Sequence, residues 1–432
     1  MTRQGFSGTT TGLQRRVVRV LITGQILGGI GMGATLSLGA LLAAELSGSN
    51  AWSGMAATMS TLGAAAVAVP LARLAQRRGR RVSLSTGALV AGAGAVLAIT
   101  ATAIGSFPLL LLALMMLGAG SATNLQARFA ATDLADSSFR ARDLSVVVWS
   151  TTIGAVLGPN LFGPGEVVGV ALGLPPLTGA FVFSLLATLG ASVVYQSGLR
   201  PDPLLTAVAA RNLVVGDGAQ SLVPRAGGAA ILRVNPTARY AVAVLALSQA
   251  TMVALMSMAP VHLKEHGATL TIVGLTISLH VAGMYALSPV FGWLADRFGR
   301  LPVILTGQAA MLAALVSAWL GSESMAGMTA SLILLGLGWS GSVVAASALV
   351  SDAVAVEDRP AVQGFSDFSM NGAGAVGGAS AGLILSASGY SGLGVSAMVL
   401  VGVVVAWSVV RLRARHPVRW QVGGEASRGP AS

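Results

Sequence analysis

Long apolar stretches separated by short polar connections run through almost the whole chain. A helix needs about 20 mostly apolar residues to cross the hydrocarbon core of a bilayer, so this pattern predicts twelve membrane-spanning helices in two groups of six. The first group is expected near residues 17–46, 51–74, 83–105, 107–132, 144–165 and 172–196. The second is expected near residues 238–261, 269–294, 302–321, 325–352, 362–387 and 390–410. We therefore expect an all-α, multi-pass integral membrane protein.

The composition supports the same class. Of 432 residues, 54% are hydrophobic and only 9% are charged, whereas charged side chains make up about a quarter of a soluble domain. This excludes a soluble enzyme. The net charge of +11 would suggest a nucleic-acid partner in a soluble protein, but here the basic residues lie between apolar stretches, so we expect no nucleic-acid binding.

Catalytic and metal chemistry are also absent from the pattern. The chain has no Cys, which excludes disulfides and thiolate metal sites, and its four His show no metal-ligand spacing. We find no nucleophile with an adjacent base. The sequence therefore predicts no enzymatic activity, no metal and no cofactor.

The arginines predict the topology. They fall at the N-terminus, at every second connection between the predicted spans and in the C-terminal tail, while the opposite loops hold only Lys264 as a basic residue. The positive-inside rule then places both termini in the cytoplasm. Because almost every basic residue is Arg, as is typical of a GC-rich bacterial genome, we expect the bilayer to be a bacterial cytoplasmic membrane.

The two groups of spans are copies of one another. Gly79-Arg80 reappears as Gly299-Arg300, and Asp133 reappears as Asp352, at an offset of 219 or 220 residues. Such duplicated halves are a plan of secondary transporters, with the substrate site between the halves near the middle of the membrane. The predicted divisions are a first half (1–196), a cytoplasmic linker (197–237), a second half (238–413) and a cytoplasmic tail (414–432).

Two loops carry a motif that resembles the loop signature of the major facilitator superfamily. One is GWLADRFGR, from Gly292 to Arg300, and the other is the degenerate copy ARLAQRRGR, from Ala72 to Arg80. The resemblance implies the twelve-helix fold of that family and transport without a cofactor. The first copy departs from the signature, because Gln76 stands where the family carries an acid.

The motif also predicts a gate. Asp296 can accept hydrogen bonds from Arg297, from Arg300 or from backbone donors at a neighbouring helix start, and such a cluster can hold one conformation and release the other. The alternative is that these residues only anchor the topology. The candidate gating residues are Arg77, Gly79, Arg80, Gly292, Asp296, Arg297, Gly299 and Arg300.

Span 5 contains GAVLGPNLFGPG, which is similar to the Gly-Pro motif that drug–proton antiporters of this superfamily carry in helix 5. The resemblance implies export. Gly154, Gly158 and Pro159 are expected to bend this helix and to pack it closely across the interface of the two halves. Ordinary glycine-rich helix packing is the alternative.

Ionisable groups inside spans are costly and mark functional sites by default. Asp367 lies about two turns into span 11, and its repeat mate is Val147, so this acid breaks the symmetry of the halves. We expect Asp367 to exchange a proton during transport, with Arg128 as the second residue of the coupling site. The alternative is that Asp367 forms a permanent ion pair with a fixed cation such as Arg128 and has no role in coupling. Antiporters of the family usually carry an Arg where this chain has Leu114, so any coupling role of an arginine in span 4 is expected at Arg128.

Polar, aromatic and Met side chains in several spans are candidates for the substrate cavity, because such surfaces suit bulky apolar ligands. Core packing is the alternative for each, and His280 could equally be an interhelical hydrogen-bonding residue. The candidates are Gln25, Asn124, Trp149, Gln249, Met252, Met256, His280, Tyr285 and Asn371.

These observations predict a monomeric secondary transporter that exports a lipophilic or amphipathic small molecule in exchange for protons. Two alternatives remain. One is a facilitator or proton symporter that imports a small metabolite, and the other is a non-transporting, lipid-handling membrane protein.

Overall fold

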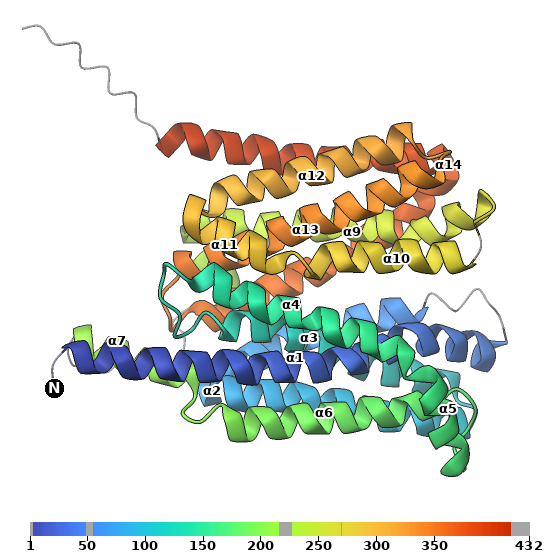
Figure 1. The fold of residues 1–432 in the computed structure, drawn as a ribbon, viewed down its shortest axis with the longest axis horizontal. Helices are drawn as coiled ribbons and strands as arrows, with labels where there is room; N and C mark the ends of the chain where they lie inside the picture. Colours follow the sequence, from blue (N-terminus) through green and yellow to red (C-terminus); the bar gives the residue numbers. More distant parts are fainter. Residues whose placement is uncertain (1–2, 49–54, 216–226, 269, 416–432) are drawn as a thin grey trace, which may run out of the picture.

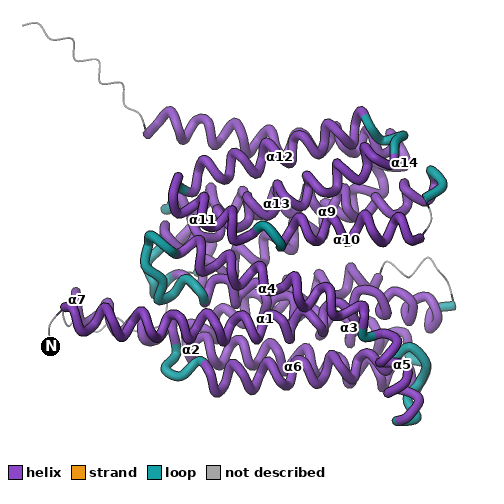
Figure 2. The backbone as a smooth tube through the Cα atoms, in the orientation of Figure 1, coloured by secondary structure: helices purple, strands orange, loops and turns teal. Residues whose placement is uncertain are grey.

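A computed structural model describes residues 3–48, 55–215, 227–268 and 270–415. All regular structure in these ranges is α-helical, and most of the loops that join the helices lie at the two ends of the molecule, while the one between α10 and α11 lies within the bundle (Figure 2). An all-helical fold follows from the composition, because a helix satisfies its own backbone hydrogen bonds where the bilayer offers no water.

The helices form two groups that lie side by side with their axes roughly parallel (Figure 1). The first half comprises α1 (Arg3–Ser47), α2 (Met55–Ala103), α3 (Phe107–Ala130), α4 (Arg140–Asn160), α5 (Phe162–Ala171) and α6 (Gly179–Gly198). The second comprises α9 (Pro236–Glu265), α10 (Leu270–Tyr285), α11 (Ser288–Phe298), α12 (Arg300–Leu320), α13 (Met325–Ala353) and α14 (Arg359–Arg415). The described parts of the predicted linker hold α7 (Pro203–Val215) and α8 (Gly228–Val234), and most of the predicted tail lies outside the described residues.

Eight helices in the described ranges are long and apolar enough to cross a membrane. One of them, Thr58–Ala103, includes two predicted spans, because α2 continues through a kink at Gly79, where φ is +87°. Its repeat mate Gly299 has a φ of +95° and separates α11 from α12. A third glycine, Gly389, has a φ of +68° and kinks α14. Glycine adopts these angles without the steric cost that other residues incur.

Within each half the helices approach closely at small residues. Gly118 of α3 lies against α2, where a Cβ would overlap the carbonyl oxygen of Ser60 and would come within 2.8 Å of the nitrogen of Ala64. Lipid is as apolar as the helix surfaces, so such backbone-to-backbone packing, rather than the hydrophobic effect, holds membrane helices together.

We predict that Gly118→Val lowers the melting temperature of the detergent-solubilised protein, because overpacking of this kind costs about 1–3 kcal/mol. Gly402→Val is the matched control, since it adds the same side chain in α14 at a site with no atom within 4 Å of the new Cβ. Equal melting temperatures for both variants would contradict this interpretation of the α2–α3 contact.

Candidate functional site

Four arginines cluster where the two halves meet at one end of the bundle. We call this the arginine-rich end and define it by Arg80, Arg140, Arg300 and Arg359. Within the first half, Arg80 Nε donates to Asp133 at 2.8 Å. Within the second half, the repeat mates make the same contact, with Arg300 Nε donating to Asp352 at 3.0 Å. The duplication in the sequence is therefore a duplication of an ion pair.

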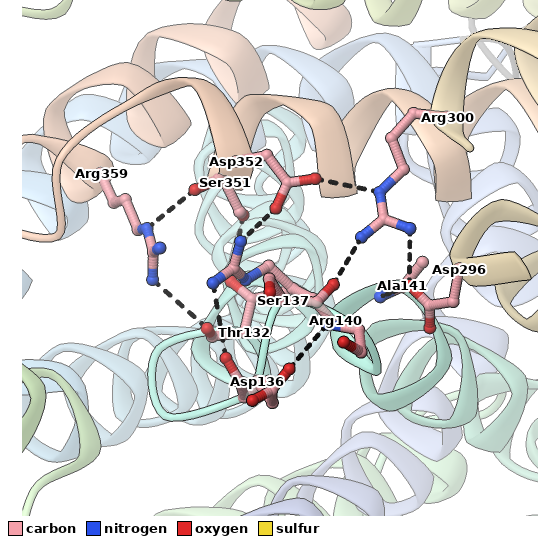
Figure 3. A network of polar contacts seen from close by, with 12 residues as sticks. Thr132, Asp136, Ser137, Arg140, Ala141, Asp296, Arg300, Ser351, Asp352 and Arg359 are labelled. Atoms are coloured by element: carbon pink, nitrogen blue, oxygen red, sulfur yellow. Dashed lines mark hydrogen bonds and ion pairs between the residues drawn. The ribbon is translucent and has the colours of Figure 1, made fainter.

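The other two arginines cross between the halves (Figure 3). Arg140, at the start of α4, pairs with Asp352 of α13. Its repeat mate Arg359, at the start of α14, donates to the carbonyl oxygens of Ser351 at 3.0 Å and Thr132 at 3.3 Å. Burial lowers the pKa of Arg359 to about 10, with Asp133 as the largest opposing influence, so its guanidinium is charged at neutral pH.

Asp296 of α11 makes a contact with the first half that its repeat mate does not make. Its carboxylate accepts from Arg300 at 2.6 Å and from the backbone N–H groups of Ala141 at 3.1 Å and Arg142 at 2.8 Å. The acid of α11 therefore sits at the N-terminus of α4 in the opposite half, where the helix dipole favours negative charge.

The degenerate copy of the motif makes a different contact. Gln76, the repeat mate of Asp296, is buried, and its Nε2 has no hydrogen-bond partner among the described residues. Instead, Arg80 donates across the interface to Gln363 of α14. The glycine also lies on the opposite helix in the two copies of this contact. In one copy Gly292 of α11 lies against Ser145 of α4, and in the other Gly364 of α14 lies against Ala72 of α2.

The gating candidates therefore separate into two groups. Arg80, Asp296 and Arg300 lie in the network, and Gly79, Gly292 and Gly299 shape its loops and contacts. Arg77 is exposed, and Arg297 lies over the rings of Trp293 and Phe298 at 5.8 Å rather than beside Asp296. The sequence drew attention to Asp133 and Asp352 only as repeat mates. It did not reveal that Asp133 pairs with Arg80, or that Asp352 binds one arginine from each half.

Deeper in the bundle, one ion pair joins the halves. Arg128 of α3 donates from a terminal nitrogen to Asp367 of α14 at 2.9 Å, and the two side chains are 2% and 0% exposed. Arg128 Nε and Asp367 Oδ2 have no hydrogen-bond partner in the part of the chain that the structure describes. One turn further along α14, Asn371 donates to the backbone oxygen of Asp367 at 2.8 Å.

Some cavity candidates lie close to this pair. Tyr285 lies in the neighbourhood of Arg128, and its ring meets Trp339 edge to face at 5.8 Å. Trp339 in turn donates to Gln249 at 2.7 Å. Trp339 was not among the residues expected to line the cavity. Its position in span 10, among small residues, was the available signal.

Other cavity candidates make contacts within one half. Gln25 donates to Thr151 at 3.0 Å, Asn124 abuts Gly28 of α1, and His280 bonds the backbone oxygen of Leu332 at 2.7 Å. Met252 is buried in the core of the second half, where Met256 also packs, and Trp149 is 37% exposed. The structure thus groups Arg128, Asp367, Asn371, Tyr285 and Gln249 more closely than the remainder.

The helix-5 motif lies at the end of α4. We expected Gly154 to pack across the interface of the halves, but its nearest neighbours are Ile26 and Gly29 of α1, within the first half. The backbones of the two helices touch there because both present glycine. Gly158 and Pro159 belong to α4, but their side-chain surroundings are outside what the structure describes. The helix breaks at Leu161 before α5 begins.

Comparisons with known proteins agree with this architecture. The family model described as Major Facilitator Superfamily matches residues 240–431. An uncharacterized MFS-type transporter of Bacillus subtilis, YdeG, is 39% identical over 92% of each chain. The riboflavin transporter RfnT of Brucella anthropi is 29% identical over 92% of this chain and 96% of its own. The crystal structure of the human organic anion transporter MFSD10 (TETRAN) has a TM-score of 0.72 at 15% identity, covering 91% of this chain and 99% of that one, which is a likeness of fold.

We predict that breaking the Arg128–Asp367 pair destabilises the folded protein more than removing both of its charges does. Asp367→Asn should lower the melting temperature in detergent markedly, because removing one partner of a buried pair costs about 3–5 kcal/mol. The double variant Arg128→Met, Asp367→Leu should recover most of this loss, since neither charge remains. Glu357→Gln is the control, because Glu357 pairs with the partly exposed Arg211, and surface pairs contribute about 0–1 kcal/mol. A double variant less stable than Asp367→Asn would argue against the pair as the cause.

Proposed function

The chain belongs to the major facilitator superfamily, and we propose that it exports a lipophilic or amphipathic small molecule in exchange for protons. The observation that carries this proposal is the buried ion pair between Arg128 and Asp367, which joins the two halves at 2.9 Å. We further propose that the protein works as a monomer in a bacterial cytoplasmic membrane, with twelve spans and both termini inside. The kinks of α2 at Gly79 and of α14 at Gly389 support the count of twelve.

The ion pair offers a way to couple protons to conformation. Arginine does not lose its proton in proteins, so Asp367 is the member of the pair that can change charge. When Asp367 accepts a proton, its attraction to Arg128 weakens and one tie between the halves is lost. A ligand shifts a conformational equilibrium by its differential affinity for the two states. A proton that binds Asp367 therefore favours the conformation in which the pair is broken.

The network at the arginine-rich end supports a gate. Asp296, Arg140 and Arg359 each bond to the opposite half, so the halves are held together at this end in the present conformation. If this end faces the cytoplasm, as the arginine distribution favours, the conformation is closed to the cytoplasm and carries an ionised Asp367. Protonation from outside would then loosen the halves and open the cytoplasmic end. One proton would enter the cell for each return to the substrate-accepting state.

Aromatic and polar side chains near the pair support an amphipathic cargo. Tyr285, Trp339 and Gln249 form a connected series beside Arg128, and together they offer flat apolar faces next to hydrogen-bonding groups. Such mixed surfaces suit ligands with both an aromatic body and a polar edge.

A second candidate function is the uptake of a small metabolite by proton symport. A metabolite as the substrate is favoured by the similarity to the riboflavin transporter of Brucella anthropi, which extends over nearly the full length of both chains. The same ion pair could couple protons in this direction.

We predict that everted vesicles with an acidic interior lose their pH gradient when an exported compound is added, and that Asp367→Asn slows this loss at least about tenfold because the coupling acid is gone. The panel consists of lipophilic cations and neutral aromatic drugs, read with a fluorescent pH indicator. Glu357→Gln is the matched control, since it removes an acid near the surface. Loss of the gradient at the same rate in Asp367→Asn would remove this residue from coupling.

Riboflavin separates the two candidates. In right-side-out vesicles placed in an acidic bath, export predicts no riboflavin accumulation, whereas symport predicts accumulation that Asp367→Asn abolishes. The fluorescence of riboflavin provides the measurement. Accumulation in the wild type would replace the export proposal with the uptake proposal.

We also predict that a disulfide between residues 132 and 351 stops transport. Thr132 Oγ1 donates to Ser351 Oγ across the halves at 3.0 Å, and the chain contains no native Cys. Thr132→Cys with Ser351→Cys should lose transport on oxidation and regain it with dithiothreitol, because the arginine-rich end must open in each cycle. Each single variant is the control. Full transport by the cross-linked protein would contradict the proposed gate.

A further inference from the structure

A groove opens on the outside of the second half, between α8, α9 and α14. Its volume is about 360 Å³, and its lining residues come from α8, α9 and α14. Two arginines are among its lining residues, and the other lining residues are apolar or small. The residues that define it here are Arg233, Arg239, Val242, Ala246, Phe365 and Ser369.

The two arginines carry uncompensated charge. Arg233 lies in the last turn of α8 and Arg239 in the first turn of α9, and both are exposed. Neither lies within 4 Å of a carboxylate in the described ranges, whereas Arg80, Arg128, Arg140, Arg211 and Arg300 all do. Two neighbouring positive charges with no acid of their own favour an anionic ligand.

Hydrogen bonds and close packing hold the turn between α8 and α9 in place. Asn235 accepts from the backbone nitrogens of Thr237 at 3.1 Å and Ala238 at 2.9 Å, and its Nδ2 donates to the backbone oxygen of Ala353 at 2.7 Å. Gly228 lies against Ala361 and Phe365 of α14 at a distance that no Cβ would permit. The turn that separates Arg233 from Arg239 is therefore fixed against α13 and α14.

The walls of the groove follow the helix axes. Arg239, Val242 and Ala246 recur at helical spacing on one face of α9, and Phe365 and Ser369 lie one turn apart on α14. From Arg239 to Ala246 the wall extends about 10 Å along α9. A ligand that fits has an anionic head beside the arginines and an apolar chain that runs along the helices into the membrane.

We propose that this groove binds an anionic phospholipid from the leaflet at the arginine-rich end. The phosphate would pair with Arg233 and Arg239, and one acyl chain would lie against Val242, Ala246 and Phe365. Basic pockets beside membrane helices recognise lipid headgroups in this way. Because α14 forms one wall and also carries Asp367, the lipid would brace the helix that holds the buried carboxylate.

Native mass spectrometry of the full-length protein in detergent tests the proposal, with dioleoyl-phosphatidylglycerol and dioleoyl-phosphatidylcholine as probes. The wild type should retain one phosphatidylglycerol in preference to phosphatidylcholine. Arg233→Gln with Arg239→Gln should weaken phosphatidylglycerol binding about 30-fold, given the typical contribution of each arginine near a membrane surface. Phosphatidylcholine binding should not change.

Two further variants keep the test decisive. Arg77→Gln with Arg78→Gln removes the same charge from two exposed arginines at the same end of the bundle, and equal loss there would show general electrostatic attraction and overturn the site. Ala246→Trp fills the groove without changing charge and should also displace the lipid, which covers the case in which the arginine variant does not fold. If inorganic phosphate alone binds and displaces phosphatidylglycerol, the groove is a site for soluble anions and the lipid proposal fails.

Discussion

The attachment of the two halves at the arginine-rich end is the constraint on which the arrangement of the molecule depends. Each half contributes a loop arginine that holds its own helix-end acid, as Arg80 holds Asp133 and Arg300 holds Asp352. Each half also contributes a helix-start arginine that reaches into the other half. Because the repeat supplies both kinds of contact twice, the halves are tied on both sides of their pseudo-symmetry axis. Arg140, Arg300 and Asp352 are partly exposed, so their ties can form and break at moderate cost, whereas Arg80 and Asp133 are buried.

Arg128 and Asp367 are as buried as Arg80 and Asp133, but Arg80 makes two hydrogen bonds to its acid and Arg128 makes one. Both charges are almost fully removed from solvent, and a buried pair regains its desolvation cost only when its geometry and remaining hydrogen bonds are good. Here one nitrogen of the arginine and one oxygen of the carboxylate have no partner in the described part of the chain. The pair is therefore poorly optimised for stability, which favours a role in which the charges must separate. Asp367 lies eight residues from Arg359 on α14, so one rigid helix connects the buried pair with the network at the end.

The sequence predicted the class of fold and the duplication because both depend on local patterns. Apolar runs of about 20 residues predict membrane helices whatever their partners are, and the recurrence of Gly79-Arg80 at Gly299-Arg300 needs no structure to be seen. The ion pair between Arg128 and Asp367 was foreseen as a possibility, since a charge inside a span needs a partner. The network was harder to predict. Asp352 could have paired with any of several nearby arginines, and its two partners, Arg140 and Arg300, follow from the approach of helices whose contact no local pattern encodes. Gly154 illustrates the same limit: its small size predicted close packing correctly, but not that α1 would be the neighbour.

The differences between the repeats indicate where the two halves have taken separate roles. Asp296 caps α4 with a charge, whereas the buried amide nitrogen of its mate Gln76 has no partner within the described ranges, and Arg80 donates to Gln363 instead. α2 contains no acidic residue, so the charged cap that Asp296 supplies between α11 and α4 has no counterpart between α2 and α14. Asp367 lies on α14, and its repeat mate is the apolar Val147. Under the proposed coupling, a proton that neutralises Asp367 would act on the side that lacks this cap. The halves would begin to separate between α2 and α14, with the Asp296 contact at α4 as the last tie to break.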